Sequence, residues 1–233
     1  MNATSILFVV LLGIPVLSAE EKKPATAPAN PEAAKLDLAN SAEGSIPGGA
    51  SIVSGKWTVD AGAKKLLVAP EPLLDAWLEF GPEIREKGAT VVASGRAPGD
   101  GRLKSRFGVG LYGKNGFQLR AVPARQEVEL VRRGEVLLRK PFTIVAEKLQ
   151  HLELSVIAER QHWIVSGRAW HEGGKRPDKP LFEHKVFSVE LLFPLAGRSV
   201  LFATPFSGEP VAFTSGVVYH GAFVEEEEGK VEE

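Results

Sequence analysis

The chain has 233 residues, of which 44 % are hydrophobic and 24 % charged, with a net charge of −1 at neutral pH. These values are close to those of average soluble proteins, and they exclude a wholly disordered chain, a collagen-like chain and a polytopic membrane protein. Because cysteine is absent, disulfides, thiolate metal sites and a cysteine nucleophile are excluded as well.

The N-terminal segment predicts export. Residues 6–12 form an uninterrupted apolar run, and the small residues Ser18 and Ala19 precede the acidic residues Glu20 and Glu21. This pattern is typical of a secretory signal peptide over residues 1–19, although the usual basic residue near the start is missing. The apolar run is shorter than the about 20 residues needed to cross a bilayer, so no membrane span is expected after cleavage. We therefore predict a periplasmic or extracellular protein.

The two flanking segments differ in charge from the body of the chain. Residues 20–44 combine alanine, proline and mixed charge with no aromatic residue, which predicts a flexible linker. Residues 224–233 are predicted to be a disordered acidic tail with a net charge of −5. Residues 45–223 hold 24 of the 28 basic and 18 of the 29 acidic residues, a net charge of +6. The near-neutral total therefore conceals a basic body.

Residues 45–223 suit one domain, and their apolar and polar residues alternate with a period of two. Such alternation is typical of antiparallel strands with one buried face, and the 24 glycines and 16 prolines favour a turn-rich fold. We expect one helical turn over residues 83–87. The predicted strands cover 56–59, 64–69, 73–80, 89–96, 106–112, 117–122, 126–132, 135–139, 151–156, 162–170, 185–191, 199–204 and 211–223. The predicted fold class is all-β, a two-sheet antiparallel β-sandwich of jelly-roll type.

Two short sequences predict tight hairpins. Asn115-Gly116 separates two alternating segments, and Arg133-Gly134 separates the next two. Asn and Gly tolerate positive φ, so we expect a two-residue type I′ turn at Asn115-Gly116, and the same kind of turn at Arg133-Gly134.

Two patterns in the body suggest chemistry but have simpler interpretations. The glycines from Gly108 to Gly113 fit a dinucleotide-binding fingerprint, but a strand follows them instead of the required helix, so we interpret them as permitting close packing or strong twist. Glu127 and Glu129 share one strand face, which we interpret as a solvated face paired with Arg125 or Arg132.

Metal binding has little support in the sequence. The five histidines have no metal-ligand spacing. No cofactor is predicted. Calcium remains an alternative, with Asp100 as the residue that would contribute to its site.

The strand sequences carry a family resemblance. The order Trp57-Thr-Val-Asp60, Leu66-Leu-Val and Trp77-Leu-Glu-Phe80 resembles the opening strands of concanavalin A-like lectin/glucanase domains, and the segments 197–204 and 211–213 resemble their closing strands. The likeness is to the laminin-G-type and 3-keto-disaccharide hydrolase-like domains of secreted bacterial proteins. It covers most of residues 45–223 but includes no catalytic signature, since the Glu-x-Asp-x-Glu strand of laminarinase-type relatives is absent.

Polar and aromatic side chains at non-core strand positions form the predicted ligand patch. In sandwich lectins a Trp on the ligand face stacks on a sugar ring, while Arg or Gln binds hydroxyl groups. Trp170 alternates with the core residues of segment 162–170 and is the expected platform. The alternative is a polar outer face with Trp170 packed under the loop 171–181. The candidate ligand-binding residues are Arg96, Arg106, Tyr112, Gln118, Arg120, Arg168 and Trp170.

The predicted function is a secreted non-catalytic binding module, with carbohydrate as the candidate ligand. The resemblance leaves two alternatives, a hydrolase of glycosides or 3-keto-glycosides and a structural envelope protein without a small ligand. The expected partner is a glycan or another envelope component. Nucleic acid is not expected because the basic residues are dispersed along the chain.

Overall fold

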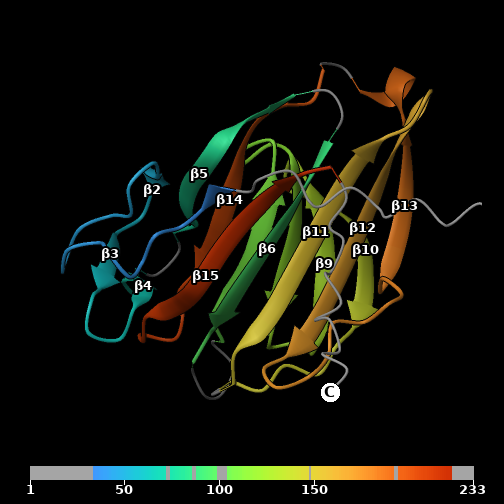
Figure 1. Cartoon of the computed structure of the whole chain (residues 1–233). Coiled ribbons are helices and arrows are strands. Elements are labelled where there is room, and N and C mark those ends of the chain that lie inside the picture. Colours follow the sequence, from blue (N-terminus) through green and yellow to red (C-terminus); the bar gives the residue numbers. More distant parts are fainter. Residues whose placement is uncertain are drawn as a thin grey trace, which may run out of the picture.

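The computed structural model describes residues 34–71, 74–85, 88–98, 104–146, 148–191 and 194–221. These residues form two antiparallel sheets that pack as a β-sandwich of jelly-roll type, which confirms the predicted fold class. Figure 1 shows the two layers, with β15, β6, β11 and β12 side by side in the nearer one. The only helical element in the described ranges is the 3-10 turn η1 (Ser188–Glu190).

Each sheet combines strands from distant parts of the chain. The first sheet has the order β13 (Phe182–Phe187), β12 (His162–His171), β11 (Gln150–Ala158), β6 (Gly88–Arg96), β15 (Val211–His220), β4 (Lys65–Val68) and β3 (Trp57–Asp60), with β1 (Ala34–Lys35) also paired to β15. The second sheet has the order β10 (Glu135–Pro141), β9 (Glu127–Arg132), β8 (Phe117–Val122), β7 (Arg106–Leu111), β14 (Ala196–Thr204), β5 (Ala76–Arg85) and β2 (Ser51–Ser54).

The core lies between the sheets and follows the period-two alternation. On β7, Phe107, Val109 and Leu111 are buried, whereas Arg106 on the same strand points outward. Phe213 of β15 stacks on Trp57 at a centroid distance of 5.9 Å and meets the edge of Phe107 at 6.2 Å. Because the apolar faces turn inward, most polar side chains of the strands lie on the two outward faces, and those that are partly exposed there are the candidates for ligand contact.

The two predicted hairpins have different turns. Arg133 and Gly134 have φ values of 50° and 83°, and Arg132 pairs with Glu135, so the β9–β10 turn has two residues with positive φ as predicted. The prediction at Asn115-Gly116 is wrong in its geometry. Leu111 pairs with Phe117, so the connection has five residues, and its positive φ values fall on Tyr112 and Gly113.

Two element predictions need correction, and one strand was not predicted. Residues 83–85 continue strand β5 instead of forming a helical turn. The strand predicted over 185–191 runs from Phe182 to Phe187, and η1 follows it. The sequence also gives no prediction of β2, in which the two central residues, Ile52 and Val53, are exposed.

The folded domain begins earlier than predicted. Residues 34–44 were expected to be linker, but Ala34 and Lys35 pair with Val218 and Val217 of β15. Leu36 and Leu38 are buried in the core between the sheets. Two leucines spaced two residues apart supply enough apolar area to hold this short segment against the sandwich. The predicted signal peptide, residues 20–33, Asp100 and the acidic tail lie outside the described residues.

Candidate ligand-binding faces

The seven predicted ligand residues do not form one patch. Three of them lie on the outward face of the first sheet, three lie on the outward face of the second sheet, and one lies in the core. The first group is Arg96, Arg168 and Trp170, the second is Arg106, Gln118 and Arg120, and the core residue is Tyr112. The sandwich thickness separates the two groups, so a single ligand cannot contact both.

Tyr112 is a correction to the predicted patch. Its side chain is 5 % exposed, and its ring meets the edge of Trp163 at a centroid distance of 6.2 Å. Burial raises the pKa of its hydroxyl. The turn geometry explains the difference, since the positive φ of 68° ends the alternation that would have directed this side chain outward.

On the first sheet, Arg168 serves to fasten a loop. Its Nη1 donates to Glu153 Oε1 at 2.7 Å, and its Nε and Nη2 donate to the carbonyl oxygens of Pro177 and Asp178. Arg176, from the same loop, donates from Nε to the other oxygen of Glu153 at 2.5 Å. The Glu153 carboxylate is 1 % exposed and is held by both guanidinium groups. Arg168 is therefore a structural residue, because each of its nitrogens already has a partner.

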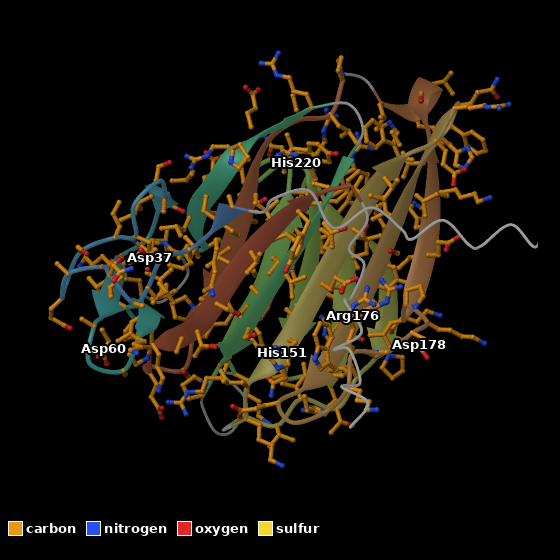
Figure 2. All side chains as sticks on the ribbon, in the orientation of Figure 1. Asp37, Asp60, His151, Arg176, Asp178 and His220 are labelled. Atoms are coloured by element: carbon orange, nitrogen blue, oxygen red, sulfur yellow. The ribbon has the colours of Figure 1, made fainter. Side chains whose placement is uncertain are left out.

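Trp170 lies beside this ion pair in a row that crosses four strands. Its indole stacks on the imidazole of His151, its cross-strand neighbour, at a centroid distance of 5.0 Å and an interplanar angle of 20°. His151 Nδ1 lies 2.6 Å from Ser94 Oγ on β6, and Ser215 Oγ on β15 donates to Ser94 Oγ at 2.9 Å. Trp170 and His151 are both partly exposed. Figure 2 shows His151 and Arg176 over the same part of the nearer sheet. We call Trp170, His151, Ser94 and Ser215 the Trp170 row.

The surroundings of His151 favour its neutral form. Because Ser94 accepts from Ser215, its own hydrogen is available for His151 Nδ1 in the tautomer that carries the ring proton on Nε2. Burial lowers the pKa of His151, while the Glu172 carboxylate acts in the opposite direction. Burial therefore favours the neutral form of the His151 ring.

On the second sheet, Arg120 lies on aromatic rings. Its guanidinium carbon is 4.3 Å from the centroid of Phe202 and 5.7 Å from that of Trp77. To reach Phe202 on β14, the Arg120 side chain crosses β7 at Gly108. Gly108 is the cross-strand partner of Arg120 on one side and of Phe202 on the other. A side chain at position 108 would also overlap the backbone of β8. Gly108 and Gly110 of the apparent dinucleotide fingerprint thus allow close approach of β7 and β8, and Gly108 leaves room for Arg120.

The remaining candidate patterns have structural partners. Glu127 and Glu129 lie within ion-pair distance of Arg125, as expected, but their second partner is Arg139 of β10 and not Arg132. No group of three or more metal-binding side chains occurs among the residues that the structure describes. No helix in those residues is long and apolar enough to cross a membrane.

Sequence reasoning missed most of the Trp170 row and its support. Ser94 and Ser215 carry no local signal, since their role depends on the pairing of β6 with β15. Glu153 and His151 were visible as polar residues of an alternating strand, but their partners lie on β12 and in the following loop. Only Trp170 stood out, because it closes an alternating segment that also contains Trp163.

Comparison with solved structures shows the same fold in proteins of very different sequence. The carbohydrate recognition domain of Emp47p matches with a TM-score of 0.54 at 11 % identity, over 81 % of this chain and 95 % of that one. A bifunctional GH43-CE protein of Bacteroides eggerthii has a TM-score of 0.55 at 12 % identity, over 80 % of this chain and 27 % of that one. A xylan beta-1,4-xylosidase of Bacillus halodurans matches with a TM-score of 0.53 at 13 % identity, over 87 % of this chain and 41 % of that one.

These likenesses show the fold alone, because the identities are so low. The chain spans less than half of the two enzymes but nearly all of the Emp47p domain. A potassium-bound form of the Emp46p carbohydrate recognition domain also matches, with a TM-score of 0.50 at 13 % identity. No protein-family model matches the sequence, and no curated protein matches it.

Proposed function

We propose that this protein is a non-catalytic carbohydrate-binding module of the concanavalin A-like type, and that its ligand face is the outward face of the first sheet. The observation that carries the proposal is the partly exposed stack of Trp170 on His151, continued by the hydroxyl groups of Ser94 and Ser215. An indole supplies an apolar surface for the C–H face of a sugar, and the adjoining imidazole and hydroxyls supply hydrogen-bonding groups.

Rigidity of the Trp170 row supports this proposal. The indole is held by its stack on His151, and the neighbouring loop is fastened by Glu153, Arg168 and Arg176. A side chain that is already ordered loses little conformational entropy when a ligand binds. The similarity of the fold to a carbohydrate recognition domain agrees with the proposal.

The second sheet offers a poorer platform for a sugar ring. Trp77 is 7 % exposed and Phe202 is fully buried, with Arg120 lying over both rings. A hydrolase would require carboxylates that face a substrate, whereas Glu127 and Glu129 are engaged by Arg125 and Arg139. No contact among the described residues favours the hydrolase over the binding module.

The proposal is tested by screening the full-length protein on a glycan array and measuring affinity for the best ligand by calorimetry. Trp170→Ala is expected to weaken binding about tenfold or more, because loss of a stacking aromatic costs about 1.4 kcal/mol or more. Phe187→Ala is the matched control, since Phe187 is an exposed aromatic residue on β13 of the same sheet, paired with the opposite end of β12. Equal loss in both variants, or no glycan ligand at all, would contradict the proposal and favour a structural envelope protein.

We also propose that the protein acts outside the cytoplasm. The support is the apolar run at residues 6–12 with Ser18 and Ala19 after it. Intact-mass analysis of protein isolated from its native host is expected to show a chain that starts near Glu20. A chain that retains Met1 in the extracytoplasmic fraction would contradict this.

A further inference from the structure

We propose that the outward face of the second sheet carries a separate oxyanion site at Arg120, which takes a carboxylate or sulfate group. The site lies on the opposite face from the Trp170 row and does not depend on the proposed carbohydrate function.

The first step of the argument is the environment of the guanidinium. Arg120 is partly exposed and lies over the rings of Phe202 and Trp77, which are almost completely buried. Burial lowers the pKa of the Arg120 guanidinium. The charges of Asp75 and Glu129 act against that change, whereas the charge of Arg106 adds to it. A charge in such surroundings is poorly hydrated, and a contacting anion would stabilise it.

The second step is the absence of a contacting counter-ion. Within the described part of the chain, no carboxylate lies at ion-pair distance from Arg120. Its Nε and Nη2 both donate to a single neutral acceptor, Gln118 Oε1, and its Nη1 has no hydrogen bond to the described residues. Gln118 is fully buried and is fixed by donating from Nε2 to the carbonyl oxygen of Lys114.

The third step is that the nearest carboxylates already have partners. Asp75 Oδ1 accepts from Thr204 Oγ1 at 2.8 Å. Glu129 Oε1 accepts from Arg125 Nη1 at 3.3 Å and from Arg139 Nε at 3.2 Å. Glu129 therefore shares its charge between two other arginines. An external oxyanion at Nη1 would supply the contacting negative charge that the fold does not provide, and the nearby Arg106 would add to the attraction.

The site is tested by NMR titration of the full-length protein with three probes: inorganic sulfate, trigalacturonate and a neutral galactose trisaccharide. The indole N–H of Trp77 and the Nε–H of Arg120 are the reporters. We expect saturable shifts of both signals with trigalacturonate, and none with the neutral trisaccharide. Saturation with sulfate as well identifies a general oxyanion site, whereas saturation with trigalacturonate alone identifies a carboxylated saccharide as the source.

Variants on the same sheet complete the test. Arg120→Gln is expected to weaken trigalacturonate binding about tenfold or more, the usual effect of losing a hydrogen bond to a charged group. Arg85→Gln is the control, because Arg85 lies on β5 of the same sheet, is exposed, and is paired with Glu83, which has no role in the proposed site. If Arg120→Gln does not fold, the wild-type reporters still decide the question. Absence of saturable shifts at Trp77 and Arg120, or equal loss in both variants, would overturn the proposal whether or not Trp170 binds a glycan.

Discussion

Gly116 is required by the close approach of two backbones and not by its own backbone conformation. It closes the five-residue connection between β7 and β8, and its N–H donates to the carbonyl oxygen of Gly113. Its φ is not positive, in contrast to those of Tyr112 and Gly113. The sequence identified the hairpin correctly, but the residues with unusual φ could not be placed without the register of the two strands.

Gly116→Val is expected to lower the free energy of unfolding by about 2 kcal/mol or more, since its Cβ would overlap the carbonyl oxygen of Leu111 and lie 2.8 Å from the Cβ of Tyr112. The measurement is chemical denaturation. Gly62→Val is the control, because a Cβ at Gly62 would meet only Asp60 Oδ1 at 3.6 Å. Equal midpoints for the two variants would contradict this account of the turn.

Protonation of His151 is expected to weaken the Trp170 row. The imidazolium cannot accept at Nδ1, so this hydrogen bond would have to reverse, with Ser94 Oγ as the acceptor and its own hydrogen in need of another partner. Because burial holds the pKa of His151 below its ordinary value of 6.5, the unfolded chain takes up this proton at a higher pH than the folded one. The stability that comes from keeping His151 neutral is complete above the pKa of the unfolded chain. It is lost as the pH falls from 6.5 to the lower pKa of the folded chain.

The matching measurement is an NMR titration of the His151 ring, together with glycan affinity between pH 5 and 8. We expect a midpoint below 6.5 and an affinity that falls as the pH passes through it. In His151→Gln the same pH dependence of affinity should be absent. A midpoint at or above 6.5 would show that burial does not favour the neutral ring.

At the scale of elements, the loop after β12 is held by a carboxylate on β11. Glu153 binds Arg168 of β12 and Arg176 of the loop, and Arg168 also holds the carbonyl oxygens of Pro177 and Asp178. The period-two pattern predicts β11 and β12, because each buries an alternating set of apolar residues. It does not predict this loop, whose anchor lies 23 positions away from Arg176.

Glu153→Ala is expected to release the loop and to cost about 3 kcal/mol, because it leaves two partly buried guanidinium groups without their carboxylate. The direct measurement is limited trypsinolysis. Cleavage after Lys175 should become faster, whereas Pro177 and Pro180 protect the sites after Arg176 and Lys179. Glu183→Ala, at an exposed position on β13, is the control. Unchanged cleavage in Glu153→Ala would show that other contacts hold the loop.

Across the whole molecule, the last two strands complete both sheets. β14 lies between β5 and β7 in the second sheet, and β15 lies between β4 and β6 in the first. The sequence predicts these strands and the sandwich class, since both follow from local alternation. It does not predict which strands are neighbours. For that reason Arg120 and Trp170, which look alike in the sequence as polar-face residues, were expected on one patch but lie on opposite faces.

The four tryptophans of the chain give the most direct test of the proposed glycan face. Trp57 lies in the core, and Trp163 packs against the same core. Trp77 lies on the second sheet, and Trp170 lies on the outward face of the first sheet. The measurement is an NMR titration of the four indole N–H signals with a neutral glycan selected on the array. The account predicts a saturable shift of the Trp170 signal, with those of Trp57 and Trp77 unchanged. A shift of Trp77 with Trp170 unchanged would contradict the account, because the glycan would then bind the opposite face.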